Sequence, residues 1–208
     1  MPIAKFAIGP LGTNSYVAHI TSNACVIDVG GDPEEILAYI TGQSLTITAI
    51  CITHRHFDHI YGVEKLARVS GAPVYISPKD NILADNESGK GGIWGLPPVP
   101  KFTALDMPLG ATIFADMDCM VLETPGHTPG GVALYFPALN SLFSGDTLFY
   151  RSIGRTDFPY GDSSQLLKSV RDVLFKLPDN VKVYPGHGPE TTIGFEKKNN
   201  PFAGEFVV

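Results

Sequence analysis

The chain has 208 residues, of which 44% are hydrophobic and 17% charged, and this excludes both a disulfide-stapled peptide and an intrinsically disordered chain. Its 15 lysines and arginines face 21 aspartates and glutamates, giving a formal net charge of −6. No overall basic field therefore attracts a nucleic acid, and we expect no nucleic-acid partner. The length favours a single domain over residues 1–208.

The cysteines and the N-terminus bear on cellular location. Cys25, Cys51 and Cys119 each lie in an apolar run, which predicts buried free thiols in a reducing compartment. The first residues lack the basic stretch and apolar stretch of a secretory signal, and no apolar run is long enough to cross a bilayer. We therefore expect a cytoplasmic protein without a membrane partner.

Strand-like runs dominate the first part of the chain. Residues 3–8, 15–20, 24–29 and 46–52 are rich in Val, Ile and Thr and are bounded by Gly, Asn or Pro. A helix is predicted over 33–40, with Asp32 as its N-cap, because proline and two glutamates follow. A second helix is predicted from Ile60 to Val69, followed by a strand at 74–76.

A long loop is predicted between the two halves, over residues 85–101. It is rich in glycine and proline and carries the only tryptophan, Trp94. Two interpretations stay open: a lid over a site, or a tryptophan that pins a surface loop to the core. Further elements are predicted after it, with strands at 111–115, 119–124, 132–136, 141–144 and 181–184 and a helix at 163–177. This order favours an α/β layered fold.

Five of the six histidines fall in three short motifs, each where a predicted strand ends. The first motif reads Thr-His-Arg-His-Phe-Asp-His. Alternate side chains of extended backbone point to one side, so His54 and His56 face one ion. The chain must then turn to enter a helix, which displaces Asp58 and His59 toward a second ion. The sixth histidine, His19, is interpreted as an ordinary sheet residue.

Three other strand ends contribute one ligand each. They are Pro-Gly-His-Thr-Pro-Gly around His127, Ser-Gly-Asp-Thr around Asp146 and Pro-Gly-His-Gly around His187. His127 can complete a group of three histidines, and His187 can join the second pair of ligands. The two carboxylate oxygens of Asp146 can bridge both ions.

The donor set indicates the chemistry. Imidazole nitrogens and carboxylate oxygens suit zinc, with iron and manganese as alternatives, and the absence of cysteine argues against a closed structural site. Two ions about 3.5–4 Å apart could share a hydroxide, since they lower the pKa of the parent water towards about 7. The sequence thus predicts two divalent metal ions and an attacking hydroxide, with no side-chain nucleophile.

The order and spacing of these motifs resemble the metallo-beta-lactamase superfamily over residues 3–190. The resemblance implies a four-layer αββα sandwich with a metal site at one edge of its two sheets. Within the superfamily the sequence is similar to short forms of glyoxalase II, the hydroxyacylglutathione hydrolases. That similarity implies hydrolysis of S-(2-hydroxyacyl)glutathione, such as S-lactoylglutathione, to glutathione and a 2-hydroxy acid by a metal-bridging hydroxide.

The resemblance also assigns a role to each motif residue. Asp58 and Asp146 are the catalytic candidates, and Asp58 also handles the proton. Asp28 matches an aspartate that orients a ligand histidine. The ligands implied are His54, His56 and His127 for the first metal, Asp58, His59 and His187 for the second, and Asp146 as the bridge.

The resemblance to glyoxalase II also suggests a substrate-binding residue, Arg155. Residues 145–155 resemble the segment in which glyoxalase II carries a cation that contacts glutathione, so Arg155 is the candidate substrate-binding residue. The alternative is a structural ion pair with Asp157. The chain lacks the C-terminal helical region of full-length glyoxalase II, and no tyrosine follows His187 closely. The expected partner is a small thioester derived from glutathione.

Other activities of the superfamily remain open. Persulfide dioxygenases are relatives that bind a single iron through two histidines and one aspartate, and they carry the Gly-Arg-Thr-Asp-Phe string seen at 154–158. A phosphodiesterase or nuclease is disfavoured by the net charge of −6. Lactonase or beta-lactamase activity and a non-catalytic metal-binding role are further alternatives.

Overall fold

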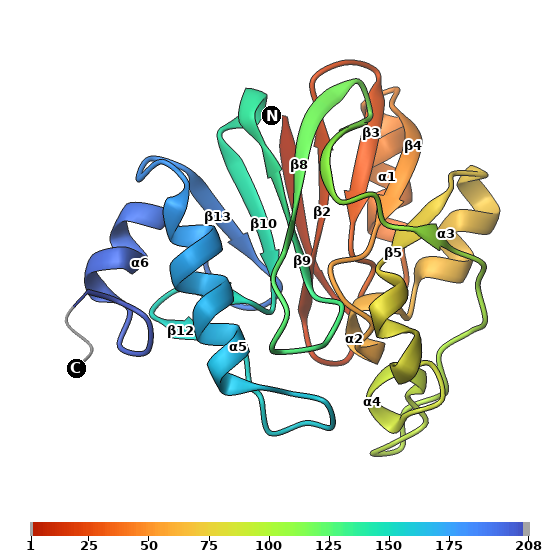
Figure 1. The fold of residues 1–208 in the computed structure, drawn as a ribbon. Coiled ribbons are helices and arrows are strands. Elements are labelled where there is room, and N and C mark those ends of the chain that lie inside the picture. The colour runs from red at the N-terminus through yellow and green to blue at the C-terminus, as the bar shows by residue number, and fades with distance from the viewer. Residues whose placement is uncertain (1, 206–208) are drawn as a thin grey trace.

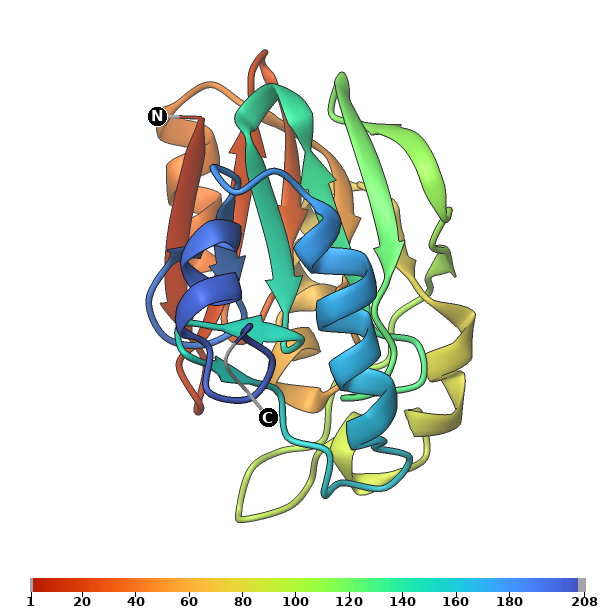
Figure 2. The same cartoon turned by 60° about the vertical axis from the view of Figure 1, so that its left-hand side comes forward.

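Two six-stranded sheets face each other, and helices cover the outer side of each, in a computed structural model that describes residues 2–205 (Figures 1 and 2). The predicted αββα sandwich is confirmed. The predicted strands are present, each shifted by no more than two residues at either end. The short hairpin of β11 and β12, the short strands β6 and β14 and several short helices add to the prediction.

The first sheet has the strand order β1-β2-β3-β4-β5-β6. β1, β2 and β3 are antiparallel neighbours, whereas β3 to β6 run parallel. Parallel neighbours need crossover connections, and the helices on the outer face supply them. The strand bounds are β1 Ile3–Ile8, β2 Thr13–His19, β3 Asn23–Ile27, β4 Thr46–Cys51, β5 Val74–Ile76 and β6 Leu105–Asp106.

The second sheet has the strand order β14-β13-β10-β9-β8-β7. β10 and β13 are parallel, and the other neighbours are antiparallel. A separate hairpin of β11 and β12 follows β10 in the chain. The bounds are β7 Gly110–Phe114, β8 Met117–Glu123, β9 Val132–Phe136, β10 Ser141–Gly145, β11 Leu148–Phe149, β12 Ser152–Ile153, β13 Lys182–Pro185 and β14 Thr191–Thr192.

Three apolar clusters hold the four layers together, and the alternation of side chains along the strands creates them. In β3, Cys25 and Ile27 face the other sheet, while Ala24 and Val26 face the helices. A third cluster packs the outer face of the second sheet against the C-terminal helices. All three cysteines are buried and free, as expected.

The helices on the first sheet differ slightly from their prediction. The first, α1 (Glu34–Gly42), begins after Pro33, and the Asp32 carboxylate accepts the backbone N–H of Glu34 without acting as the N-cap. The helix predicted from residue 60 is two helices, α2 (Phe57–Ile60) and α3 (Val63–Ser70). α2 thus begins early enough to include Asp58 and His59, whereas His54 and His56 precede it.

Two further segments were predicted only in part. The expected loop at 85–101 contains a short helix, α4 (Glu87–Lys90), because the Asn86 side chain accepts the N–H of Ser88 and caps it. The helix expected over 163–177 is α helical only over α5 (Ser163–Lys168) and continues as a π turn and a 3₁₀ turn. A last helix, α6 (Ile193–Asn199), was not predicted.

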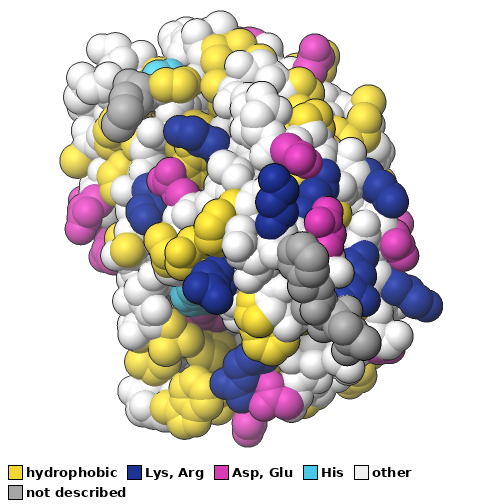
Figure 3. Space-filling model, turned by 90° about the vertical axis from the view of Figure 1, so that its left-hand side faces the viewer, with side chains coloured by type: hydrophobic (Ala, Val, Ile, Leu, Met, Phe, Trp, Pro, Cys, Tyr) yellow, Lys and Arg dark blue, Asp and Glu magenta, His cyan; other side chains and the backbone are white. Residues whose placement is uncertain are grey.

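Within residues 2–205, no helix combines the length and the apolar character needed to span a bilayer. Figure 3 shows one face of the molecule, where hydrophobic side chains gather at the lower end, below a histidine that is largely covered by its neighbours.

We predict that a single methyl group between α2 and α3 destabilises the fold. A Cβ at Gly62 would collide with the carbonyl oxygen of Gly31, and the Gly62 N–H donates to the Val29 carbonyl. Gly62→Ala should therefore lower the free energy of unfolding by about 1–3 kcal/mol in urea denaturation. Gly42→Ala is the control, because nothing lies within 4 Å of its added methyl. A Gly62 variant as stable as the control would contradict this packing.

Candidate metal centre

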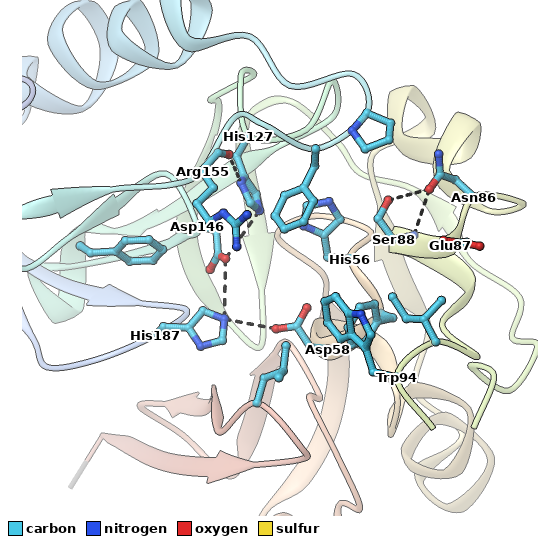
Figure 4. A pocket seen from close by; sticks show the side chains of 16 residues that line it. His56, Asp58, Asn86, Glu87, Ser88, Trp94, His127, Asp146, Arg155 and His187 are labelled. Atoms are coloured by element: carbon cyan, nitrogen blue, oxygen red, sulfur yellow. Dashed lines mark hydrogen bonds and ion pairs between the residues drawn. The ribbon is translucent and has the colours of Figure 1, made fainter. Parts of the chain in front are cut away.

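The candidate ligands converge because four strands end at the same edge of the two sheets. The first motif follows β4, His127 follows β8, Asp146 follows β10 and His187 follows β13. The side chains of His56, Asp58, His127, Asp146 and His187 point into one cavity (Figure 4). Segments up to 133 residues apart in the sequence, from His54 to His187, thus meet at one place.

The first group consists of the three histidines His54, His56 and His127. Their ligand atoms all lie within 4.8 Å of one another, and the three residues are buried, at no more than 5% exposure. The ring centroids of His54 and His127 are 4.8 Å apart, and those of His56 and His127 are 4.5 Å apart. Three imidazoles at this spacing can share one ion.

The second group consists of Asp58, His59 and His187, whose ligand atoms also lie within 4.8 Å of one another. Asp58 Oδ2 is 3.2 Å from His187 Nε2 and 3.7 Å from His59 Nε2. Asp146 lies between the groups, with Oδ1 3.3 Å from His59 Nε2 and Oδ2 3.6 Å from His127 Nε2. The structure therefore brings together all seven residues that the sequence singled out.

Unpaired polar atoms show that this cluster fits metal ions. Five buried atoms at the centre have no hydrogen-bond partner among the described residues: Nε2 of His54, His56, His59 and His127, and Oδ1 of Asp146. A buried polar atom without a partner costs on the order of 1–3 kcal/mol, so five together at one point are unfavourable without a ligand. Nitrogen and carboxylate donors without sulfur suit zinc, iron or manganese.

The pKa values differ between the two groups. Burial lowers the pKa of His56 to about 3 and, together with the neighbouring imidazoles, holds that of His54 well below its usual value. Burial disfavours charge on His59 and His187 too, but the carboxylates of Asp58 and Asp146 outweigh it and raise both pKa values. His54 and His56 are thus neutral and ready to donate lone pairs.

The carboxylates respond in the opposite sense. Burial alone would raise the pKa of Asp58 and Asp146, but the adjacent His59 and His187 lower both. Because their pKa values are raised, His59 and His187 take up protons more readily than a free imidazole does, and an ion has to displace these protons. Metal uptake by the second group therefore releases protons and weakens as the pH falls.

Hydrogen bonds fix the orientation of the ligand rings. Asp28 Oδ2 lies 2.8 Å from His59 Nδ1, and its carboxylate also accepts the N–H and the hydroxyl of Thr53. Asp28 adopts a left-handed φ of 54° and is only 1% exposed, unlike an ordinary turn aspartate. His127 Nδ1 donates to the Arg155 carbonyl at 2.6 Å. Such contacts leave the Nε2 atoms free to face the centre.

Sequence reasoning missed Asp80, which is fully buried and joins the two loops of the first group. Its Oδ2 accepts the Arg55 N–H at 2.9 Å and the Thr128 hydroxyl at 3.0 Å, and its Oδ1 accepts the Gly130 N–H at 2.5 Å. Arg55 lies between two ligand histidines, and Thr128 follows the third. Nothing local in the sequence distinguishes this aspartate from a surface residue, since its partners are 25 to 50 residues away.

Two neighbouring residues of β2, also missed, support the second group. The Thr13 hydroxyl donates to Asp58 Oδ2 at 2.9 Å. The Asn14 amide donates to the carbonyls of Pro185 and Gly188, and the Asn14 N–H donates to Gly186. These bonds cross from the first sheet to the segment that carries His187.

The two residues with open interpretations lie at the rim. Arg155 is exposed and forms a bidentate ion pair with Asp157 at 2.9 and 2.6 Å, and its guanidinium lies 4.6 Å from the centre of the Phe158 ring. The structural pair thus exists, and contact of Arg155 with substrate stays a prediction. Trp94 is 72% exposed, so it does not pin its loop into the core. His19 lies in β2 near Tyr39, apart from the centre.

A cavity of about 780 Å³ opens onto the centre. His56, Asp58, His127, Asp146 and His187 form its inner end. Most of the remaining wall is apolar, and its large apolar side chains are Leu11, Phe57, Ile93, Trp94, Phe149 and Phe158. The volume suits a small molecule.

The metallo-beta-lactamase superfamily model matches residues 8–187, so the chain belongs to this superfamily of metal-dependent hydrolases. It is 35% identical to a probable metallo-hydrolase, YqgX, of Bacillus subtilis, over 97% of each protein. It is also 35% identical to the hydroxyacylglutathione hydrolase GloC of Haemophilus influenzae, over 86% of this chain and 87% of that protein.

Solved structures agree with this assignment. The BLEG-1 B3 metallo-beta-lactamase superimposes with a TM-score of 0.91 at 36% identity, over 97% of this chain and 99% of that one. TTHA1623 in a di-iron-bound form gives 0.87 at 38% identity, over 96% and 99%. ETHE1 from Myxococcus xanthus gives 0.79 at 30% identity, over 98% and 85%.

We predict that Asp80→Ala weakens metal binding about 10- to 100-fold, because it releases the two loops of the first group from each other. Competition with a chromophoric chelator at neutral pH measures the affinity. Glu196→Ala is the matched control: Glu196 is an equally buried carboxylate that accepts from Arg151, Thr191 and Asn200 away from the centre. Equal losses of affinity in both variants would show that general destabilisation, not loop positioning, is responsible.

Proposed function

We propose that the protein is a metal-dependent thioester hydrolase that converts S-(2-hydroxyacyl)glutathione, with S-lactoylglutathione as the reference substrate, and water to glutathione and a 2-hydroxy acid. The observation that carries the proposal is the pair of three-residue groups on either side of Asp146, open to a cavity of small-molecule size. The similarity to GloC, named a hydroxyacylglutathione hydrolase, supports the substrate class.

The proposed cofactors are two divalent ions, zinc in the first place, with iron or manganese as alternatives. The di-iron form of TTHA1623 supports iron as an alternative. When bound, such ions supply Lewis acidity toward a thioester carbonyl and a water that is acidic enough to attack at neutral pH.

Asp58 and Asp146 have different roles in the proposed reaction. Asp58 is held by the Thr13 hydroxyl and lines the cavity, where it can take up the proton of the attacking water. Asp146 lies between the groups and fixes their relative position. The C–S bond breaks as the new C–O bond forms, and the proton ends on the glutathione sulfur.

The substrate contact proposed for glutathione is Arg155, which lines the cavity at its rim. A guanidinium can hold a carboxylate bidentately, although here Asp157 occupies it. The proposed partners are therefore small anionic thioesters, and the proposed location is the cytoplasm.

A persulfide dioxygenase is the second candidate. It is favoured by the Gly-Arg-Thr-Asp-Phe string at 154–158 and by the likeness to ETHE1. Against it stands the complete second group, since a single iron held by two histidines and an aspartate would leave Asp58, His59 and His187 without a role. The likeness to BLEG-1 makes a beta-lactam the third substrate to assay.

We predict hydrolysis of S-lactoylglutathione by the metal-loaded protein, followed as loss of thioester absorbance. Asp146→Ala should lower kcat/KM at least about 100-fold, because it removes the residue between the two groups. Asp116→Ala, a surface carboxylate that binds Thr21 and Asn23, should leave it unchanged. Oxygen uptake and sulfite formation from glutathione persulfide, without thioester hydrolysis, would replace this proposal by the dioxygenase.

We predict that the partner of Arg155 limits its contact with substrate. Asp157→Asn removes the competing carboxylate charge and should lower KM for S-lactoylglutathione about two- to fivefold, whereas Arg155→Met should raise it. The kcat values should stay constant, because neither side chain is a ligand candidate. Steady-state kinetics at low salt provide the measurement. If KM is the same in both variants, Arg155 does not contact the substrate.

A further inference from the structure

Trp94 is the largest apolar side chain of the protein, yet it is 72% exposed and lines the cavity beside the metal centre. Its backbone has a left-handed φ of 53°, which costs about 1 kcal/mol or more in a residue with a bulky side chain. Packing in the protein core does not explain this conformation, since most of the ring faces solvent. The left-handed φ belongs to the tight turn in which the Leu96 N–H donates to the Ile93 carbonyl, and this turn holds the indole at the cavity wall.

The segment around Trp94 is anchored at several points. The Trp94 ring meets Phe57 edge to face at 6.0 Å, and Phe57 meets Tyr61 at 5.6 Å. The Tyr61 hydroxyl donates to the Pro97 carbonyl, and the Val99 N–H donates to the Lys90 carbonyl. Phe57 directly precedes Asp58, so this aromatic row leads from the rim to the second group of ligands.

The charges around the cavity distinguish its two sides. Glu87, in α4, lines the side that carries Trp94 and Ile93, where it repels an anion. Among the residues that the structure describes, Arg155 is the one lysine or arginine of the cavity wall, and it lies beside His127. Figure 4 shows Arg155 near His127 and Asp146, and Trp94 near Asp58, with His56 between them. An anionic tail is thus favoured on the Arg155 side and disfavoured at Trp94.

We propose that Trp94, Ile93 and Phe57 form an apolar subsite that binds an aryl group on the acyl part of the substrate. The inference rests on the proposed thioester hydrolysis and narrows its substrate class to aryl-substituted 2-hydroxyacyl thioesters. With the glutathione part directed to Arg155, the acyl substituent extends to the opposite wall. A phenyl ring there covers the exposed indole face, whereas a methyl group leaves it in water.

Two thioesters that share the thiol and the 2-hydroxyl group test this subsite. S-mandeloylglutathione carries a phenyl group where S-lactoylglutathione carries a methyl group. The ratio of kcat/KM for S-mandeloylglutathione to kcat/KM for S-lactoylglutathione should fall about tenfold or more in Trp94→Ala. Comparing ratios between variants cancels the different intrinsic reactivity of the two thioesters.

The controls separate ring contact from other effects. Trp94→Phe keeps an aromatic face and should retain most of the preference. Phe202→Ala removes an aromatic side chain that is 49% exposed but lies outside the cavity wall, and the ratio should not change. An equal ratio in wild type and Trp94→Ala would overturn the subsite.

Fluorescence tests the subsite without turnover. Trp94 is the only tryptophan, so all indole emission reports on this position. Titration of the metal-loaded protein with mandelate should shift or quench the emission saturably, and lactate at the same concentrations should not. If neither thioester is hydrolysed but mandelate still binds, the proposed reaction fails while the aryl subsite stands. If thioesters are hydrolysed and mandelate leaves the emission unchanged, only the subsite fails.

Discussion

The convergence of imidazole and carboxylate groups at Asp146 is the constraint on which the rest of the structure depends. Four Nε2 atoms and one carboxylate oxygen are buried there without hydrogen-bond partners among the described residues. Grouping them is unfavourable for the chain by itself, because each has left water without gaining a hydrogen bond. Bound ions would accept the lone pairs of these atoms and make their grouping favourable, so metal binding at this centre would increase the free energy of unfolding.

The fold can tolerate this arrangement because the ligand segments are cross-linked independently of any metal. Asp28 orients His59, Asp80 joins the loops of the first group, and Asn14 holds the segment of His187. Each of these side chains is almost fully buried, where hydrogen bonds are well protected from water. The rings are therefore held near a binding geometry, which reduces the entropy lost when an ion binds.

How much of this could be predicted depends on the range of the interactions. The ligand motifs were visible because His54, His56, Asp58 and His59 are neighbours in sequence and sit where a strand ends. The strands followed from composition and alternation. Asp80 was missed because its partners lie far away along the chain. The end of regular α helix at Lys168 was missed because apolar residues at helical spacing predict one continuous helix, and tertiary packing overrides that pattern.

The inner and outer parts of the cavity follow different physical rules. At the inner end, seven side chains from four strand ends are constrained by each other, so a change in one alters the whole centre. At the rim, Trp94 and Arg155 are exposed, and each contacts few neighbours. Substitutions there cost the fold little, since exposed side chains contribute little to stability. The type of reaction thus depends on residues at the strand ends, whereas the choice of substrate depends on loop residues that can change without disturbing the metal ligands.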